Sequence, residues 1–416
     1  MRVTTAFCRL LRLDGVRVRD VRFEPDRVVV GVALRRRRLV CPRCSFSTPH
    51  RHDIRPMDSV WRHLDLGIWR LEVRARLRRL VCPAHGVLTE AVPFARYRSD
   101  FTRDFEHLVA WLATRTDKTT ITRQLRIHWR TVGRIIERVC AQELDPDRLD
   151  DLFEIGIDEV GWRKGHRYLT LVADHQRRQI VWGAEGASAK VADTFFEQLG
   201  PERCARIEAV SMDMGPGYAK STRANAPQAI VCIDSFHVAK LGGDALDEVR
   251  REYWNELRTL GDQDAAKRFK DARWALLKRP EKLTDRQAQT LRALKAAGGK
   301  VARGYELKEA LRSIFAPGLG VDDVSELLTR FSSRASRSRM QPFVRLARTI
   351  RKHRDGILAA VRLGLTNARA EALNNKVRLI TRRAYGFHSA TAALALVMLT
   401  CGPITLQPPH ELHLHR

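Results

Sequence analysis

The sequence has no long apolar run and no secretory leader. Its longest apolar stretch, residues 390–399, has about half the length that a helix needs to span a bilayer. The N-terminus, MRVTTAFCRLLRLDG, lacks the apolar core of a signal peptide. We therefore expect a cytoplasmic protein without a membrane partner. In that compartment the eight cysteines stay reduced, which favours metal ligands or buried thiols over disulfides.

Acidic residues are also scarce. The 416 residues include 75 Lys and Arg against 48 Asp and Glu, a formal net charge of +27. The first hundred residues contain 22 Arg, ten acids and no Lys, a net charge of +12. Such an excess favours a polyanionic partner, most often nucleic acid. With 44% hydrophobic residues the chain has enough apolar content for a core and is not a disordered basic tail. We expect double-stranded DNA as the partner and the nucleoid as the location.

Two short pairs of metal-ligand residues lie in this basic region. They are Cys41 with Cys44, and Cys82 with His85, and two residues separate the members of each pair. Each pair opens with Cys-Pro after a strand-like segment, so both side chains can reach one ion from a tight turn. Three thiolates and one imidazole suit a closed, tetrahedral structural zinc site. Two alternatives stay open: His50 or His52 as the fourth ligand, or four unconnected residues.

Residues 118–140 predict a helix-turn-helix. Apolar residues at helical spacing would pack its two helices together: Ile121, Leu125, Ile127, Val132, Ile135 and Ile136. Residues 126–128 fit the turn, and the following helix would expose three arginines, Arg130, Arg134 and Arg138. A basic helix of this kind fits the major groove of DNA. The plain alternative is a helical hairpin with a solvated basic face.

The middle of the chain alternates short apolar runs with helical patterns, which is typical of an α/β fold. Strands are predicted at residues 153–158, 168–173, 179–184, 207–213 and 230–234, and helices at 190–199, 218–226 and after 234. This order is that of an RNase-H-like fold, whose first and fourth strands lie side by side and parallel. Residues 242–366 predict helices throughout, and residues 73–81 (VRARLRRLV) predict one strand with a basic face.

Asp158 and Asp213 stand at the ends of the first and fourth predicted strands. Their carboxylates would converge at one edge of the sheet and need cations to offset their repulsion. Two magnesium ions, or manganese in their place, suit such a site, because a metal pair can activate a water or a 3′-hydroxyl for phosphoryl transfer. A later helix would supply the third acid, for which Glu371 is the best candidate. Nearby residues on that helix suit contact with DNA: Asn374, Lys376 and Arg378.

Asp234 and His237 follow the fifth strand as Asp-x-x-His. They either support the acids from behind or cap the next helix. Each acid has a plain alternative as well. Asp158 would then be a solvated strand end, Asp213 a turn residue, and Glu371 a favourable charge at a helix N-terminus.

Four sequence blocks resemble the ISL-three family of bacterial insertion-sequence transposases. They are IDEVGWRKGHRYLTLVAD, VSMDMGPGY, CIDSFHVAK and NARAEALNNKVRLITRRAYGF, in the family's order. The resemblance implies that Asp158, Asp213 and Glu371 are the DDE triad. It implies that the Asp-x-x-His residues match a block shared in outline with Mutator-like transposases, and that the long helical stretch is an insertion. His85 stands where the family more often has cysteine.

The predicted organisation is an α/β RNase-H-like core with an all-helical insertion, preceded by a zinc-binding β module and a helix-turn-helix. The boundaries are 1–100 for the zinc module, 101–147 for the helix-turn-helix domain, 148–241 for the first part of the core, 242–366 for the insertion, 367–400 for the final core helices and 401–416 for a tail.

The resemblance implies a DNA transposase that binds the terminal inverted repeats of its own element, cuts their 3′ ends and joins them to target DNA. We expect it to act as a homo-oligomer on DNA. One rival is a non-catalytic DNA-binding regulator built on the zinc and helix-turn-helix parts, against which the three acids argue. The other is a repair or recombination nuclease on the same fold.

Overall fold

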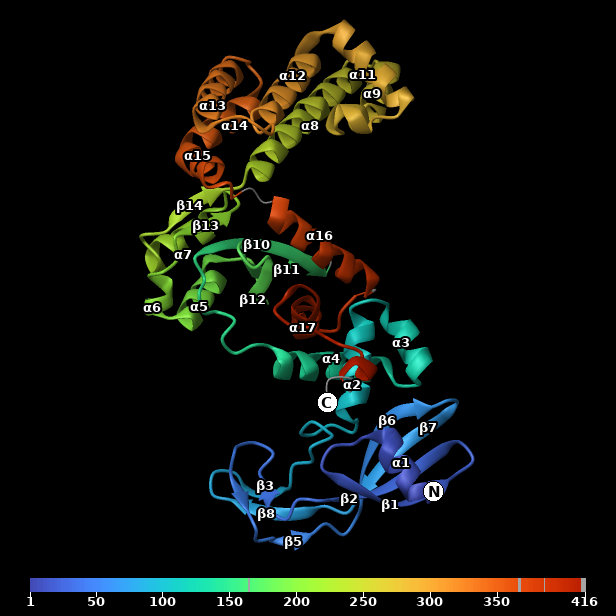
Figure 1. Ribbon diagram of the computed structural model, residues 1–416. Helices are drawn as coiled ribbons and strands as arrows, with labels where there is room; N and C mark the ends of the chain where they lie inside the picture. The colour runs from blue at the N-terminus through green and yellow to red at the C-terminus, as the bar shows by residue number, and fades with distance from the viewer. Residues whose placement is uncertain (164, 366–367, 385, 413–416) are drawn as a thin grey trace. The chain divides into compact units, whose positions relative to one another are not determined.

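The computed structural model describes residues 1–163, 165–365, 368–384 and 386–412 (Figure 1). The chain forms two compact units. The first contains Met1–Asp145 and Ile380–Arg416, and the second contains Pro146–Leu379. The two ends of the chain therefore belong to one unit. The finer domain boundaries that the sequence suggests stay predictions.

The first unit begins with one helix and nine strands. Their bounds are α1 (Val3–Leu11), β1 (Val16–Phe23), β2 (Arg27–Leu34), β3 (Leu39–Val40), β4 (Ser47–Thr48), β5 (Asp53–Ile54), β6 (Ser59–Leu66), β7 (Trp69–Ala75), β8 (Arg78–Cys82) and β9 (Gly86–Thr89). Strands β1, β2, β7 and β6 form one sheet in that order, β5, β8 and β9 form another, and β3 pairs with β4. Val30 of β2 and Val73 of β7 pair in register and are fully buried, in a core that Phe7 of α1 covers.

The predicted single strand over residues 73–81 is wrong. β7 ends at Ala75, β8 begins at Arg78, and the two belong to different sheets. Leu77 between them is buried in the core of the first sheet, whereas Leu80 is buried in a small second core. The predicted strand is interrupted because its apolar residues are buried in two different hydrophobic cores. Its arginines each pair with an acid: Arg74 with Glu72, Arg76 with Asp58, Arg78 with Glu90, and Arg79 with Asp53.

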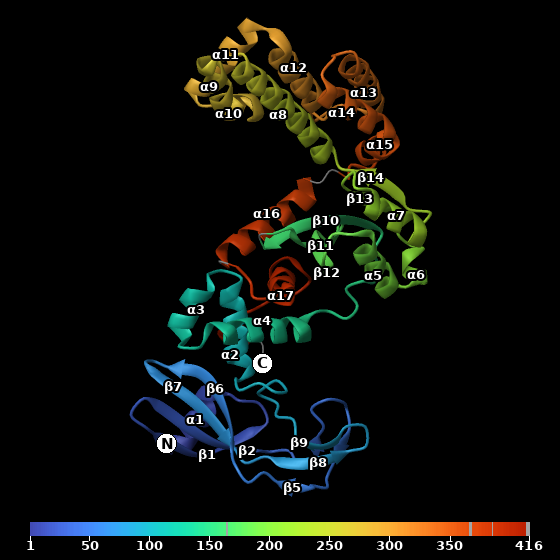
Figure 2. The same cartoon turned by 180° about the vertical axis from the view of Figure 1, so that it is seen from behind.

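Five helices complete the first unit. They are α2 (Arg103–Ala113), α3 (Lys118–Leu125), α4 (Trp129–Glu143), α17 (Ala390–Cys401) and α18 (Pro409–Leu412). α17, with the sequence ATAALALVMLTC, is apolar on every side, and such a helix has to be buried. It packs against α4 (Figure 2).

The second unit is built on a five-stranded sheet with the order β12-β11-β10-β13-β14. Its elements are β10 (Glu154–Arg163), β11 (Arg167–Asp174), β12 (Gln179–Glu185), α5 (Ala189–Leu199), α6 (Pro201–Cys204), β13 (Ala209–Met212), α7 (Pro216–Asn225) and β14 (Ile230–Ile233). β10, β11 and β12 form an antiparallel meander, while β13 is parallel to both β10 and β14. Parallel neighbours need crossover connections, which α5, α6 and α7 provide. The predicted order of elements and the parallel pairing of the first and fourth strands are confirmed.

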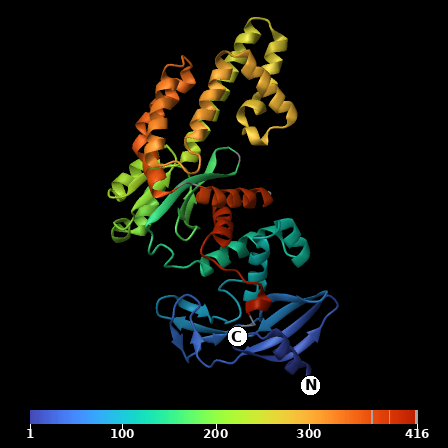
Figure 3. The same ribbon diagram turned by 45° about the horizontal axis from the view of Figure 1, so that its top comes forward.

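From the end of β14 to α16, the described residues are helical with short connections (yellow to red in Figure 3). The elements are α8 (Ser235–Thr259), α9 (Gln263–Asp271), α10 (Arg273–Leu277), the 3-10 helix η1 (Pro280–Lys282), α11 (Asp285–Ala297), α12 (Gly299–Ser313), α13 (Val321–Ser336), α14 (Gln341–Lys352), α15 (Arg354–Leu363) and α16 (Ala368–Arg383). α8 and α12 approach closely at glycines: a Cβ at Gly242 would lie 3.1 Å from Leu311, and one at Gly304 would lie 3.1 Å from Leu246. Across the described residues, we find no helix with both the length and the apolar character to cross a membrane.

Candidate functional site

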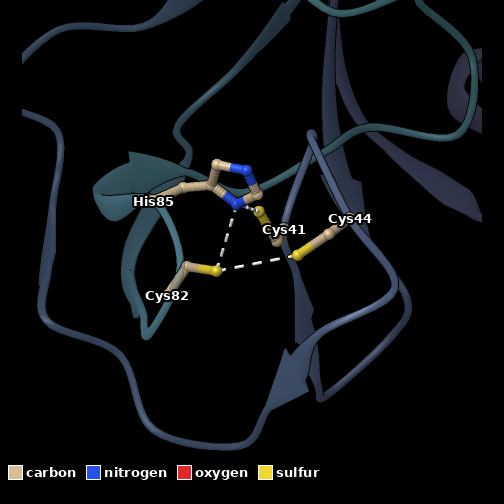
Figure 4. Close-up of side chains that lie close together, drawn as sticks. All are labelled: Cys41, Cys44, Cys82 and His85. Atoms are coloured by element: carbon tan, nitrogen blue, oxygen red, sulfur yellow. Dashed lines mark hydrogen bonds between the residues drawn. The ribbon is translucent and has the colours of Figure 1, made fainter.

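The two predicted ligand pairs meet in the first unit (Figure 4). Cys41 and Cys44 follow β3, Cys82 ends β8, and His85 lies in the turn before β9. The Cys44 and Cys82 sulfurs are 3.7 Å apart, and His85 Nδ1 lies 3.7 Å from Cys41 Sγ and 3.5 Å from Cys82 Sγ. Thiolates bound to one tetrahedral zinc ion at about 2.3 Å stand roughly 3.8 Å apart. The donor set therefore fits zinc.

The surroundings of this Cys/His cluster also favour metal binding. Burial raises the pKa of the Cys41 thiol, but hydrogen bonds with the backbone N–H groups of Arg43 and Cys44 and with the thiols of Cys44 and Cys82 together bring the net pKa below its ordinary value. The Arg43 N–H donates to Cys41 Sγ at 3.4 Å. Within the described part of the chain, these four residues are the one group of His, Cys, Asp or Glu side chains whose ligand atoms lie close enough together to hold a metal ion. Of the two alternative fourth ligands, His50 is exposed, and His52 Nδ1 lies 3.1 Å from Asp53 Oδ2.

The helix-turn-helix forms where it was predicted. α3 begins at its cap Asp117, whose Oδ1 accepts from the Thr120 N–H at 2.9 Å, and ends at Arg126 in the left-handed conformation. α4 begins after His128, whose ring accepts from the Arg130 N–H at 3.2 Å. The predicted apolar contacts are buried, with the exception of the half-buried Ile127: Ile121, Leu125, Val132, Ile135 and Ile136.

One of the three predicted arginines on α4 is not exposed. Arg130 and Arg134 are exposed as predicted. The Arg138 side chain is only 24% exposed, and its guanidinium donates to the fully buried Glu106 of α2. The prediction that α4 exposes Arg138 is therefore wrong. The cause is a buried acid on a neighbouring helix, which the pattern of α4 alone does not reveal.

Glu106 is the centre of a buried charge network that the sequence did not indicate. Arg96, whose side chain is fully buried, donates to Glu106 at 3.0 Å and to Glu143 at 2.6 Å. The Ser99 hydroxyl donates to Glu106 at 2.6 Å. A hydrogen bond from His107, together with Arg96, lowers the pKa of Glu143 to about 2. This arginine–glutamate network joins the segment before α2 to both α2 and α4.

The first predicted acid lies inside a strand. β10 continues past Asp158 to Arg163, because β11 pairs with it as far as Arg163↔Arg167. The prediction that Asp158 ends its strand is therefore wrong. The parallel pairing with β13 runs only to Gly156↔Ser211. When that register is extended by two residues, Asp158 stands opposite Asp213, which directly follows β13.

Glu159 is an acid that sequence analysis did not assign to the site. Burial raises its pKa, and the charges of Asp213 and then Asp158 raise it further. The Tyr218 hydroxyl of α7 donates to Glu159 at 3.3 Å and lies 3.0 Å from Thr170. The charges of Asp213 and Asp158 thus both act on Glu159, and we refer to Asp158, Glu159 and Asp213 as the acidic cluster. Their oxygens are the donors that magnesium prefers, and a divalent cation relieves their repulsion.

The remaining predicted residues have mixed outcomes. Asp213 Oδ1 also accepts from the Gly215 N–H at 2.8 Å, so Asp213 shapes its turn as well. Asp234 is buried, caps α8 by accepting from the Phe236 N–H at 3.0 Å, and lies 4.0 Å from His237. Asp234 thus caps α8, and its support of the acids stays a prediction.

The predicted residues on α16 are placed only in part. Glu371 and Asn374 lie on this helix, but their side chains are outside the described part of the structure. Lys376 and Arg378 are exposed, and Arg378 donates to Asn375 at 3.3 Å.

Known proteins match the chain along almost its whole length. Residues 155–396 match a family described as "Transposase", specifically its ISL3 DDE type, and residues 90–140 match the "Helix-turn-helix domain of transposase family ISL3". The "Transposase for insertion sequence element IS1557" of Mycobacterium tuberculosis is 38% identical, over 96% of each chain. The "Transposase for insertion sequence element IS1001" of Bordetella parapertussis is 30% identical, over 84% of this chain and 85% of its own.

The chain belongs to the ISL3 family of transposases, the ISL-three family named above. It is an enzyme of the DDE transposase type with a helix-turn-helix domain. The first match spans β10 to α17 and includes the acidic cluster. The second spans Arg96 and the helix-turn-helix, and therefore most of the arginine–glutamate network.

Proposed function

We propose that this transposase binds the terminal inverted repeats of its own element, cuts their 3′ ends and joins them to target DNA. The acidic cluster is the observation that carries the proposal. The register of β10 and β13, extended by two residues, would set Asp158 opposite Asp213, and burial and nearby charge raise the pKa of Glu159. Acids that crowd one another favour divalent cations, whereas a surface that only contacts DNA is basic. The cluster therefore argues against a non-catalytic regulator.

In this proposal the core is RNase-H-like and α8–α15 form an insertion. The sheet order and the parallel β10–β13 pair support that assignment. Asp158 and Asp213 hold two magnesium or manganese ions, Glu371 completes the site, and Asp234 and His237 support it from behind. When bound, the ions supply an activated water or 3′-hydroxyl and stabilise the leaving oxygen. The chain's own part is to fix the spacing of the carboxylates through the strand register.

DNA contacts come from two helices. Arg130 and Arg134 of α4 read the element ends, since both are exposed and four residues apart on one face. On α16, phosphate contacts near the acids come from Asn374, Lys376 and Arg378. Arg138 was predicted to join the first group, but its ion pair with Glu106 favours a structural role. An element has two ends to be processed, so we propose a homo-oligomer on DNA, acting at the nucleoid in the cytoplasm.

The Cys/His cluster is proposed to bind one structural zinc ion. Four protein ligands leave no open position for catalysis. Purified protein should contain about one zinc per chain, and Cys82→Ala should lose it. Cys8→Ala, which changes a cysteine outside the cluster, should keep the metal. Full zinc content in Cys82→Ala would contradict the site.

The catalytic proposal is tested with a plasmid that carries the inverted repeats flanking the gene. Asp213→Asn removes one charge of the acidic cluster and should abolish cutting and joining while binding to the ends persists. Glu208→Gln changes an exposed acid at the opposite end of β13 and should behave as wild type. Cutting by Asp213→Asn at the wild-type rate would remove this residue from the site. Binding without cutting by the wild type, in magnesium or manganese, would favour the regulator, and cutting without joining would favour a nuclease.

A further inference from the structure

The hairpin of β6 and β7 ends in an exposed apolar tip. Gly67 and Ile68 form its two-residue turn, and Leu66 pairs with Trp69 across it. Gly67 has φ +61°, a conformation that glycine adopts without strain. The Ile68 side chain is 81% exposed, and Leu66 and Trp69 are about 40% exposed. Large apolar side chains gathered at one exposed tip mark a contact surface.

This tip is fastened to the helix-turn-helix. Arg126, in the turn between α3 and α4, donates from Nη1 to the Ile68 carbonyl at 3.0 Å. Its Nη2 pairs with Asp65 on the same hairpin. Figures 1 and 2 both show the end of the β6–β7 hairpin beside α3. The hairpin therefore has a definite position next to the turn.

A groove of about 870 Å³ separates the tip from α3. Exposed polar side chains of α3 line it: Thr120, Arg123 and Gln124. Asp65 also lines the groove, and its charge is balanced by Arg126 and by a second ion pair with Arg62. The groove thus combines net positive charge with side chains of the kind that contact DNA phosphates.

We propose that the β6–β7 tip is a second DNA contact, which enters the minor groove beside the major groove occupied by α4. Duplex DNA on α4 carries its backbone past the turn at residues 126–128, where Arg126 holds the tip. Leu and Ile are among the side chains that enter the minor groove and open base steps. Arg123 and Gln124 then face the phosphates between the two grooves. This inference rests on the proposed function, because it requires α4 to lie on the element ends.

The test is methylation protection on a duplex that ends in the terminal inverted repeat. Dimethyl sulfate methylates guanine N7 in the major groove and adenine N3 in the minor groove, so one reaction reports both contacts. The wild type should protect guanines under α4 and adenines beside them. Ile68→Ser should lose the adenine protection, keep the guanine protection and bind about tenfold more weakly. Met57→Ser removes another highly exposed apolar side chain of the first unit, 73% exposed, and should match the wild type.

A second variant separates position from charge. Asp65→Ala removes one of the two contacts between Arg126 and the hairpin, the ion pair, and removes an acid near DNA. If only the loss of negative charge mattered, this variant would bind DNA more tightly. If the tip contacts the minor groove, the variant should protect adenines less than the wild type does. Zinc content and thermal unfolding, measured on both hairpin variants, confirm that they fold.

Three other outcomes would each overturn the tip contact. Guanine protection without adenine protection in the wild type overturns the tip contact and leaves the proposed function in place. The absence of both protections overturns the two together. An unchanged footprint for Ile68→Ser, with a changed oligomeric state, would assign the tip to a protein–protein contact and overturn the proposal.

Discussion

Two groups of acids in this transposase have opposite surroundings. In the first unit, His107 and Arg96 lower the pKa of Glu143 to about 2. In the second, burial and the charge of Asp213 raise the pKa of Glu159. Both glutamates are partly buried, so burial alone does not explain why one pKa is lowered and the other is raised. The neighbouring groups differ: an acid paired with arginine suits a structural role, whereas acids beside one another suit the cation site that we propose.

The largest expected effect comes from breaking the acidic cluster. Asp158→Asn keeps the shape of the side chain and removes a charge that we propose to hold metal. We expect cutting of supercoiled plasmid in magnesium to fall by several orders of magnitude, because nucleophile activation and leaving-group stabilisation are lost together. Binding to element ends should persist.

Glu185→Gln is the matched control for that variant. It changes an acid of the same sheet whose side chain is 51% exposed, and activity should stay at the wild-type level. A wild-type rate in Asp158→Asn would contradict the assignment, and Glu159 would become the next candidate.

Breaking the arginine–glutamate network should change stability instead. Glu106→Gln removes one of the two carboxylates that pair with the fully buried Arg96 and also the partner of Arg138, which should lower the free energy of unfolding by about 3 kcal/mol. Asp58→Asn breaks an exposed pair with Arg76 and should cost less than about 1 kcal/mol. Denaturant unfolding measures both. Equal losses would show that the network adds nothing beyond a surface pair.

The network also predicts a pH dependence. The pKa of Glu143 is about 2 in the folded chain, against an ordinary value of 4.5. Its stabilisation is therefore fully present above pH 4.5 and is lost as the pH falls toward 2. Glu143→Gln should cost on the order of 1–2 kcal/mol at neutral pH, after a discount for its partial exposure.

The stability difference between Glu143→Gln and the wild type, measured by thermal unfolding, should shrink as the pH falls below 4.5. A difference that is constant across this range would show that Glu143 is not held by these charges.

The smallest effect should have the opposite sign. Glu159→Gln removes one of three crowded negative charges, so metal-free protein should gain a little stability, whereas Glu106→Gln loses it. Added magnesium should stabilise the wild type more than the variant, because the cluster then has fewer charges to offer the ion. Unfolding with and without magnesium measures both effects. A loss of stability without metal would place Glu159 among the structural acids.

Much of the fold follows from local pattern. The helix-turn-helix was predicted because its apolar residues recur at helical spacing, and the order of the five core strands because each is a short apolar run. The same reasoning failed over residues 73–81, where one apolar pattern is divided between two cores at Leu77. The apolar pattern also predicts that β10 ends at Asp158, which is too early, because pairing with β11 extends the strand past this residue.

The site was predicted less completely than the fold. The four residues of the Cys/His cluster stand in two pairs with two residues between the members of each pair, and one tight turn is enough to bring both side chains of a pair together. Glu159 and the arginine–glutamate network had no such signal. Arg96 reaches Glu143 across 47 positions of sequence, and no spacing rule connects residues that far apart.

By itself the sequence determined which segments become helices and strands, which four residues form the Cys/His cluster, and which family the acids resemble. These depend on backbone periodicity and on ligands a few residues apart, which short stretches of chain encode. Only the tertiary structure decided which charges become neighbours: Glu159 with Asp213, Arg138 with Glu106, and Arg126 with the tip of a hairpin. The reason is physical, because strand register and helix packing set these contacts, and a shift of one residue turns a side chain to the opposite face.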